Sequence, residues 1–363
     1  VRYVILLDPA TQLPRDAGRQ LVAAMAHPLN RPLLDASGSR VIAGHGLLQP
    51  RVTPALPAAD ASRYERLHGG APVASAGARS ASDIYQDLFG AGDWSGQGIY
   101  EVDTWERVLG RAVPEGRVLS HELLAGCYLR AGLAGAVEVH ETCPARYSDD
   151  VGRRHRWLRG DWQLAGWLRT RVPAPGGKRV PNPLPPLARW KLFDRLRRSL
   201  VAPTLAATLV LCWSLLPEPA FWSAAALAVF FLPAFLGMFI AWGDRPHDML
   251  WRQHLANWWR GARNALSHAV MRTAFLPHEA WYSLDAIARS SWRMLVSRRR
   301  LLEWKAPSLA RSSLDLEANW RNMWFAPALA VGSALLLTFA HPFALFAAAP
   351  LLLLWFLSPI LAW

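Results

Sequence analysis

An aspartate directly follows a short apolar run near the start of the chain. Tyr3–Leu7 has the apolar and β-branched content of a buried strand, and Asp8 comes next, before Pro9. Sheets of the α/β class bind ligands at the carboxyl ends of their strands. Carboxylates at such a position hold divalent cations that neutralise phosphate groups. Asp8 is therefore a candidate metal ligand, although one aspartate after a strand is a weak signal by itself.

A second acidic residue stands at a predicted helix start, in the run Ser120-His121-Glu122. Glu122 is a candidate general base that removes a proton from a hydroxyl group. The alternative is structural, because an acidic side chain in the first turn stabilises a helix through the macrodipole. The residue alone does not decide between these two interpretations.

Cations and indoles alternate in the segment from Arg153 to Gln163 (RRHRWLRGDWQ). Arg153 and Arg156 can hold phosphate, and Trp157 and Trp162 offer flat faces on which a ring can stack. The alternative is a basic patch beside a membrane that binds lipid headgroups.

Apolar runs that alternate with helical patterns indicate an α/β domain over residues 1–172. The predicted strands are Tyr3–Leu7, Arg40–Ala43, Gly46–Gln49 and Val137–His140, and the predicted helices are Arg15–Ala26, Ser82–Leu88, Thr104–Leu109 and Ser120–Ala131. The Pro- and Gly-rich stretch Val172–Pro186 predicts a linker, so that 173–198 forms a basic segment beside a membrane.

Long apolar segments follow, with the length that a bilayer requires. They are Leu200–Leu216, Ala220–Trp242, Phe325–Ala340 and Phe343–Trp363. We predict four spans in two hairpins, at 199–242 and 325–363, and the alternative is buried helices of a soluble protein. Arginines lie before the first span and in the loop 243–324, while the hairpin turns have none, so both flanking regions are predicted to be cytoplasmic.

The loop 243–324 contains an amphipathic pattern over Ala280–Arg300, with apolar residues at three- and four-residue spacing opposite arginines. This pattern predicts a helix in the membrane interface, in contact with lipids. Packing on the soluble domain is the alternative. The net charge of +13 and the 19 tryptophans also favour a membrane protein, and no nucleic-acid-binding motif is present. The three cysteines are expected to be reduced.

The order of these motifs resembles processive family-2-type glycosyltransferases, which show Asp-x-Asp, Thr-Glu-Asp and Gln-x-x-Arg-Trp before their membrane helices. Blocks of the sequence resemble cyclic β-1,2-glucan synthases more specifically. Among them are TQLPRDAGRQLVAAMAHPLNRP, IYQDLFG, GQGIYEVD, RVLSHELLAGCY, RYSDDVGRRHRWLRGDWQ and FLPHEAWYSLDAIAR. They follow one another along almost the whole chain.

The resemblance implies a partial, GT-A-like α/β nucleotide-sugar glycosyltransferase core followed by an α-helical transmembrane region in the inner (cytoplasmic) membrane. It implies inverting transfer of glucose from UDP-glucose to a β-1,2-glucan acceptor that is later closed into a ring, with Mg²⁺ or Mn²⁺. Glu122 takes the position of the base and Asp8 that of the first metal-binding acid. The implied substrate-binding residues are Arg153, Arg156, Trp157, Tyr100, Asp103, His121 and Trp162.

Two departures from the family pattern stand out. Leu-Asp-Ala-Asp-Thr is expected, but the chain reads Leu-Asp-Pro-Ala-Thr, so Ala10 replaces the second acid. The chain also begins at the Asp8 strand, without upstream uridine-binding strands, and lacks a phosphorylase-like region, which suggests a piece of a longer synthase. We therefore expect weak UDP-glucose binding and slow or no turnover.

Three alternatives stay open at this point. The chain is a processive synthase of another β-glucan, a degenerate or truncated non-catalytic membrane fragment, or a lipid-binding or transport protein. Glucose release that depends on Glu122 separates the enzymes from the other two classes.

Overall fold

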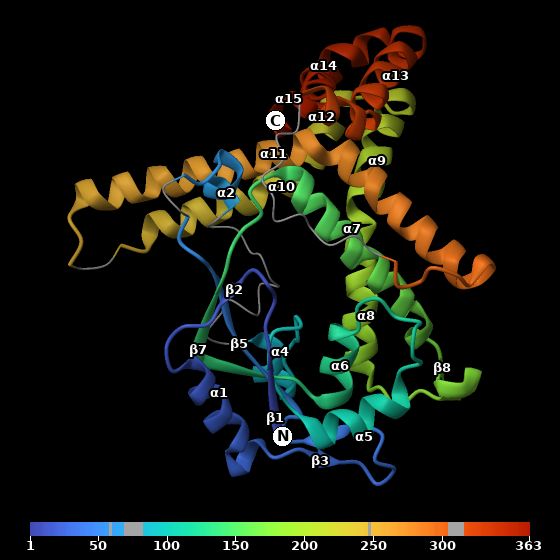
Figure 1. Cartoon of the computed structure of the whole chain (residues 1–363). Coiled ribbons are helices and arrows are strands. Elements are labelled where there is room, and N and C mark those ends of the chain that lie inside the picture. The colour runs from blue at the N-terminus through green and yellow to red at the C-terminus, as the bar shows by residue number, and fades with distance from the viewer. Residues whose placement is uncertain (58–59, 69–82, 246–247, 304–315) are drawn as a thin grey trace. The chain divides into compact units, whose positions relative to one another are not determined.

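The structure is a computed structural model that describes residues 1–57, 60–68, 83–245, 248–303 and 316–363 (Figure 1). The chain forms two compact units. The first comprises Val1–Arg198 together with Ala286–Pro307, and the second comprises Ser199–Asp285 with Ser308–Trp363. Ser82 and parts of the predicted loop 243–324 lie outside the described residues. The predicted division into five segments stays a prediction.

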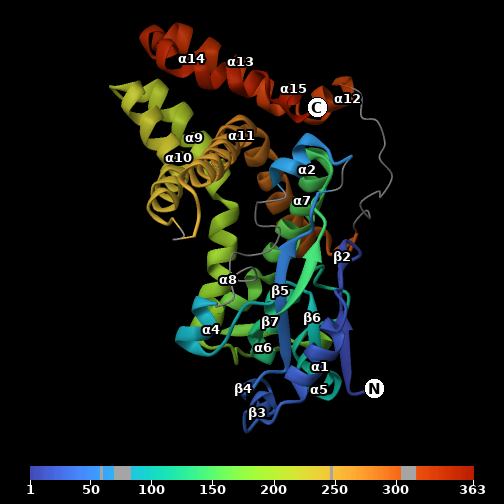
Figure 2. The same ribbon diagram turned by 90° about the vertical axis from the view of Figure 1, so that its left-hand side faces the viewer.

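Strands of the first unit form a mixed sheet, which confirms the predicted mixture of helices and strands. Among the described residues its order is β1-β6-β5-β7-β2, and Figure 2 shows β5, β6 and β7 side by side. β5 and β7 are parallel, and the other neighbours are antiparallel. The strands are β1 (Tyr3–Leu6), β2 (Thr11–Gln12), β5 (Leu47–Pro54), β6 (Gly98–Glu101) and β7 (Gly132–Glu141).

The link between β1 and β2 is short. β1 and β2 lie at opposite ends of the strand order, yet only residues 7–10 join them. The link turns at residues 9–10, where the amide of Thr11 donates to the carbonyl of Asp8 at 2.9 Å. Thr11 then pairs with Glu141, so the link ends beside the end of β7.

Alternate residues of the strands enter different hydrophobic clusters, as the two-residue period of a strand requires. Leu48 and Ile99 pack with Leu21 and Met25 of helix α1 (Ala17–Ala26). Their neighbours Leu47 and Tyr100 pack instead in the cluster that contains Leu124 and Tyr128 of helix α6 (Glu122–Leu129). The sheet thus has helices on both faces, and α6 is held with its first residue at the strand ends.

The remaining elements of the first unit are shorter or lie outside the sheet. They are α2 (Arg63–His68), α4 (Ile84–Phe89), α5 (Val102–Ala112), α7 (Tyr147–Gln163), α8 (Pro186–Ser199), β3 (Leu33–Leu34), β4 (Val41–Ala43), β8 (Arg171–Pro173) and β9 (Arg179–Pro181). β8 and β9 pair as an antiparallel hairpin inside the predicted linker. The backbone hydrogen bonds of this hairpin were not predicted, because the Pro- and Gly-rich composition indicated a linker without strands.

Helix α7 is bonded to a segment that follows much later in the chain. Arg159 donates to the carbonyl of Glu303 at 2.9 Å, and Gln163 donates to the carbonyl of Leu301 at 3.0 Å. The Ser290 hydroxyl donates to the carbonyl of Arg159 at 3.0 Å. Residues 286–303 therefore belong with α7 in the first unit.

The second unit is helical, with α9 (Val201–Leu215), α10 (Pro219–Gly243), most of α11 (Trp251–Trp292), α12 (Leu316–Asn322), α13 (Phe325–Ala340), α14 (Pro342–Phe356) and α15 (Ser358–Ala362). In the part of the chain that the structure describes, α10 alone is long and apolar enough to span a membrane. The number rises to three if the bent pairs α8–α9 and α12–α13 each count as one span. Four spans were predicted, and α14 is too short for the fourth.

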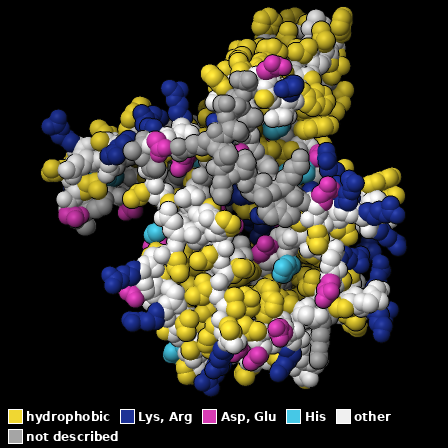
Figure 3. Space-filling model, in the orientation of Figure 1, with side chains coloured by type: hydrophobic (Ala, Val, Ile, Leu, Met, Phe, Trp, Pro, Cys, Tyr) yellow, Lys and Arg dark blue, Asp and Glu magenta, His cyan; other side chains and the backbone are white. Residues whose placement is uncertain are grey.

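Indoles hold the core of the second unit together. Trp213 and Trp355 are fully buried, with their rings 5.6 Å apart. Each indole nitrogen donates a hydrogen bond, from Trp213 to the Ser223 hydroxyl at 2.8 Å and from Trp355 to the carbonyl of Thr273 at 3.0 Å. The outside is apolar, and Figure 3 shows hydrophobic side chains gathered over α13 and α14.

The predicted amphipathic helix Ala280–Arg300 is the last part of α11, which ends at Trp292 and continues as a π-helical turn, Arg293–Ser297. Tyr282, Ala286 and Ser290 form its buried side. Trp292 and Leu295, on the predicted apolar stripe, are exposed. The stripe is thus open to contact, and its insertion into a membrane interface stays a prediction.

Candidate functional site

A cavity of about 410 Å³ lies in the first unit at the carboxyl ends of β1 and β7. Its walls come from the β1–β2 link, the segment before β6, the start of α6, the end of β7, and helices α7 and α8. Four residues singled out from the sequence line it together, namely Asp8, Glu122, Arg156 and Trp157. Asp8, Glu122 and the adjacent pair Arg156 and Trp157 are far apart in the sequence, so the fold brings two carboxylates, a guanidinium and an indole ring to one place.

Backbone bonds fix the position of Asp8. The amide of Thr11 donates to the carbonyl of Asp8 at 2.9 Å and closes a turn. Thr11 pairs with Glu141 in the β2–β7 ladder, and the amide of Thr142 donates to the carbonyl of Ala10 at 3.0 Å. The loop that carries Asp8 is therefore tied to the end of β7.

Two neighbours hold Glu122, and a third residue packs on one of them. The hydroxyl of Ser120 donates to its carboxylate. Gly96 lies so close that an added Cβ would stand 2.8 Å from Cγ of Glu122, and its φ of +94° suits glycine alone. Gly160 of α7 packs on Ser120, where an added Cβ would stand 2.5 Å from the serine Cβ. The carboxylate is thus held by a neutral donor and by close packing.

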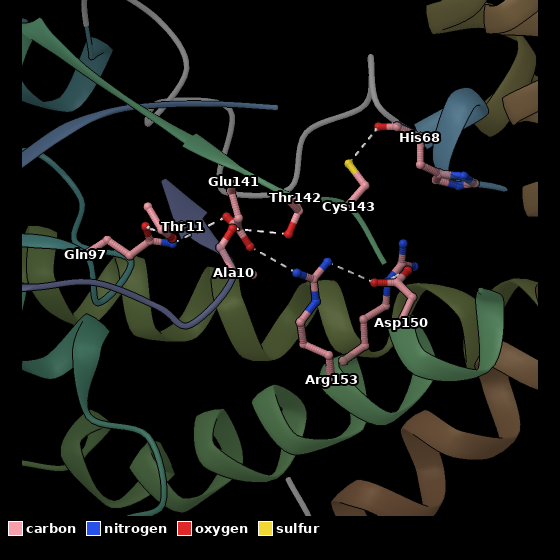
Figure 4. A network of polar contacts seen from close by, with 10 residues as sticks. Ala10, Thr11, His68, Gln97, Glu141, Thr142, Cys143, Asp150 and Arg153 are labelled. Atoms are coloured by element: carbon pink, nitrogen blue, oxygen red, sulfur yellow. Dashed lines mark hydrogen bonds and ion pairs between the residues drawn. The ribbon is translucent and has the colours of Figure 1, made fainter. Parts of the chain in front are cut away.

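A polar network beside the cavity centres on Glu141, whose side chain is buried (Figure 4). Arg153 donates to Glu141 at 3.0 Å and to Asp150 at 3.1 Å. Gln97 donates to Glu141 at 3.4 Å and accepts from the Thr11 hydroxyl at 2.7 Å. Burial raises the pKa of Glu141, the Arg153 guanidinium opposes this effect, and the Asp8 carboxylate adds to it.

Arg153, predicted to bind substrate, therefore has an ion pair on each side of its guanidinium. The same guanidinium stands over the Trp157 ring, 4.9 Å from the centroid. Arg153 does not line the cavity, whereas Arg156 and Trp157 do. Its contacts orient Trp157 and anchor α7 to β7. Trp162 lies on α7 outside the cavity wall.

Three further predicted residues lie away from the cavity wall. Tyr100 packs on Trp105, with ring centroids 4.4 Å apart, and Trp105 contacts the His121 ring at 5.9 Å. Asp103 is exposed in the first turn of α5, where its charge complements the helix dipole. Their contact with an acceptor stays a prediction.

Sequence reasoning missed several charged residues that line the cavity. Asp161 follows the Arg-Trp motif by one helical turn, and Lys191 and Arg195 come from α8, in the segment predicted as a linker. Lys191 pairs with Asp93 at 2.9 Å and donates to the carbonyl of Gly92. Asp161 follows Trp157 by four residues, which places both side chains on one face of a helix. This spacing could have identified Asp161 from the sequence.

The residues present offer a cation few ligands. No group of three or more His, Cys, Asp or Glu side chains suited to a metal occurs within the described ranges. Asp8 and Glu141 are neighbouring carboxylates, and Glu141 is already paired with Arg153. Mg²⁺ commonly uses one or two carboxylates and takes its other ligands from phosphate and water. The donor set therefore fits a cation that is bound together with a diphosphate.

Comparison with known proteins agrees with the resemblance in the sequence. No family model matches the chain. Over 368 aligned residues, which include all of this chain, it is 36% identical to the cyclic beta-(1,2)-glucan synthase NdvB of Rhizobium meliloti (strain 1021). The whole chain is similar to a segment of a glucan synthase. It spans 13% of the length of that relative, so activity, substrates and partners of the whole relative are not established for this chain.

Proposed function

We propose that the first unit is the transferase domain of a membrane glucan synthase. It would transfer glucose from UDP-glucose to a growing β-1,2-glucan. The proposal rests mainly on one observation, that Asp8, Glu122, Arg156 and Trp157 line a single cavity at the strand ends. The whole-length similarity to a cyclic glucan synthase supports the choice of donor and product.

Glu122 acts as the general base in this proposal. As the acceptor oxygen bonds to the anomeric carbon, its proton passes to Glu122, and the bond to UDP breaks with the electron pair leaving on UDP. Ser120 and Gly96 keep the carboxylate in place during the transfer. Arg156 would bind the diphosphate, and Trp157 would offer its face to a sugar ring.

Asp8 would hold a divalent cation, Mg²⁺ or Mn²⁺, bound with the diphosphate, and the cation would neutralise the charge of departing UDP. The GT-A-like fold, the cytoplasmic placement of this unit and anchoring in the inner membrane by the apolar helices belong to the same proposal. So do contacts of the chain with other regions of a longer synthase.

Label transfer from UDP-[¹⁴C]glucose into glucan, in membranes that contain the chain, tests the proposal. Glu122→Gln should lower the rate by about 10²–10⁴-fold, the usual contribution of a general base. Glu106→Gln, at an exposed position on α5, is the matched control and should transfer at the parent rate. Equal rates for Glu122→Gln and parent would refute the assignment of the base, and a product without β-1,2 linkages would refute the acceptor.

Ala10 favours a second candidate, a chain that keeps the cavity but has lost turnover. Calorimetric titration of UDP with Mn²⁺ into the detergent-purified chain, beside Ala10→Asp, separates the two. Metal-dependent binding by the parent supports the transferase. Binding by Ala10→Asp alone supports the non-catalytic candidate, and binding by neither refutes a sugar-nucleotide site in this chain.

A further inference from the structure

The cavity wall contains a second aromatic ring that has a cation over one face, Tyr85 of α4. The ammonium of Lys191, from α8, lies 4.5 Å from the centroid of the Tyr85 ring. Trp157 has the same arrangement, since the guanidinium of Arg153 stands 4.9 Å from its ring centroid. Both rings line the cavity, so each stands at the wall with one face already covered by a side chain of the protein.

Lys191 is fixed in its place over Tyr85. Its side chain is 7% exposed, and its ammonium pairs with the carboxylate of Asp93 at 2.9 Å. The same ammonium donates to the carbonyls of Ala91 and Gly92 at 3.0 Å and 2.9 Å. A buried ammonium is stable where a carboxylate and hydrogen bonds replace its water. The charge of Lys191 is therefore balanced within the protein, and its contact with the ring does not depend on a ligand.

The backbone around Tyr85 is fixed as well. The carboxylate of Asp83 caps α4, where it accepts from the amide of Tyr85 at 2.8 Å, and it accepts from the amide of Asp93 at 3.2 Å. The side chain of Gln86, the next residue of α4, accepts a hydrogen bond from the amide of Leu133 in β7. The ring thus has little freedom to lose when a ligand binds, which favours affinity.

The rest of the Tyr85 ring has no comparable contact. In the part of the chain that the structure describes, its hydroxyl has no hydrogen bond, and no ring other than its own contacts it. Trp94, the remaining ring of the cavity wall, is 1% exposed and has no face to offer. A flat aromatic face packs well on the C–H face of a pyranose ring, because both surfaces are apolar.

We propose that Tyr85 is a sugar-binding residue whose ring packs on a pyranose ring in the cavity, and that Lys191 holds this ring in position. The inference rests on the proposed function, because it takes the ligand to be a glucose unit of the donor or of the glucan. It gives the cavity a second sugar-binding ring in addition to Trp157.

Calorimetric titration of the detergent-purified chain with three ligands tests this role. Sophorose, a β-1,2-linked glucose disaccharide, represents the glucan, UDP-glucose with Mn²⁺ represents the donor, and UDP with Mn²⁺ lacks a sugar. Tyr85→Ala should weaken the binding of sophorose or of UDP-glucose about tenfold, because a ring face is lost, and should leave the affinity for UDP unchanged. Unchanged affinity for both sugar ligands, an equal loss for UDP, or a parent chain that binds neither sugar ligand would overturn the proposal.

Two matched variants separate the ring contact from the folding of α4. Tyr85→Phe keeps the ring and should bind the sugar ligands like the parent. Phe89→Ala removes a ring from the same helix that is 57% exposed and lies away from the cavity wall, and it should also bind like the parent. An equal loss in Phe89→Ala would overturn the proposal, because the loss would then come from α4 as a whole.

The titration needs no turnover, so its result is independent of the general base. Sugar binding that depends on Tyr85, in a chain that transfers no glucose, would support the sugar-binding ring and refute the transferase. Transfer that depends on Glu122, with sugar affinities that Tyr85→Ala leaves unchanged, would refute the sugar-binding ring alone.

Discussion

Two glutamates on one cavity differ in what holds them. Glu141, at the end of β7, is buried and pairs with the guanidinium of Arg153 at 3.0 Å. Glu122, at the start of α6, accepts a hydrogen bond from the Ser120 hydroxyl and has a second carboxylate, Asp161, as its electrostatic neighbour. The carboxylate of Glu141 is thus paired with a cation, whereas the carboxylate of Glu122 accepts from a neutral hydroxyl.

The difference separates a structural role from a chemical one. The ion pair of Glu141 with Arg153 ties the end of β7 to α7, and burial still raises the pKa of Glu141. Glu122 is the carboxylate to which the proposed transferase reaction assigns the acceptor proton. The following predictions separate the two roles, in order of expected effect.

Loss of the Glu141 charge should cost stability. Glu141→Gln leaves Arg153 with Asp150 as its remaining ion-pair partner, so we expect about 2 kcal/mol of destabilisation, less than the loss of a fully buried pair. Glu138→Gln, on the same strand, breaks a pair with Arg51 whose side chains are 34% and 32% exposed, and should cost less than about 1 kcal/mol. Denaturant unfolding of both variants measures the difference, and equal costs would contradict the structural role of Glu141.

Crowding of Glu122 should cost turnover. Gly96→Ala puts a methyl group 2.8 Å from Cγ of Glu122, and displacement of the base should lower kcat about tenfold. Gly116→Ala is a matched control, because Gly116 also has a positive φ, +67°, but has no atom within 4 Å of an added Cβ. It carries the same kind of backbone strain without the contact. Equal kcat values in the two variants would show that the position of Glu122 is not critical.

Removal of the Asp161 charge should change how stability depends on pH. The folded-state pKa of about 6 lies above the ordinary value of 3.8, so the folded chain binds the proton more tightly than the unfolded chain. The stability from this group is complete below pH 3.8 and is lost as pH rises through about 6. Asp161→Asn should therefore be more stable than the parent by about 1 kcal/mol at pH 8, a value reduced for partial exposure. Thermal unfolding at pH 8 and pH 4 should show this advantage at pH 8 only.

Local patterns in the sequence predicted several elements, because residue period and composition act over a few neighbours, but α7, α8 and β6 were not among them. The strand before Asp8 and the helix that begins at Glu122 are present in the structure, with shifts of one or two residues at their ends. The predicted helix Arg15–Ala26 begins at Ala17. The hairpin β8–β9 was missed because its pairing depends on contacts between residues that a local pattern does not relate.

The cavity was predicted only in part, for a similar reason. Asp8, Glu122, Arg156 and Trp157 stand out by residue type. Glu141 and Arg195 do not stand out by residue type. Nothing near Glu141 in the sequence shows that β7 ends beside Asp8, and nothing near Arg195 shows that α8 passes beside Asp161. Arg153 was assigned to substrate by its place in a motif, and its two carboxylate partners become visible only in three dimensions.

The bonds from α7 to Ser290, Leu301 and Glu303 have a consequence for biosynthesis. A ribosome releases the chain from its amino end, so the sheet and α7 emerge before Ser199–Asp285 has been translated. Until the later segment arrives, the carbonyl of Arg159 and the amide of Gln163 lack these partners. The helix that carries Arg156, Trp157 and Asp161 is therefore completed only after the apolar helices α9 and α10 have been made. Packing of the cavity wall is thus completed late in synthesis, after the candidate membrane spans have left the ribosome.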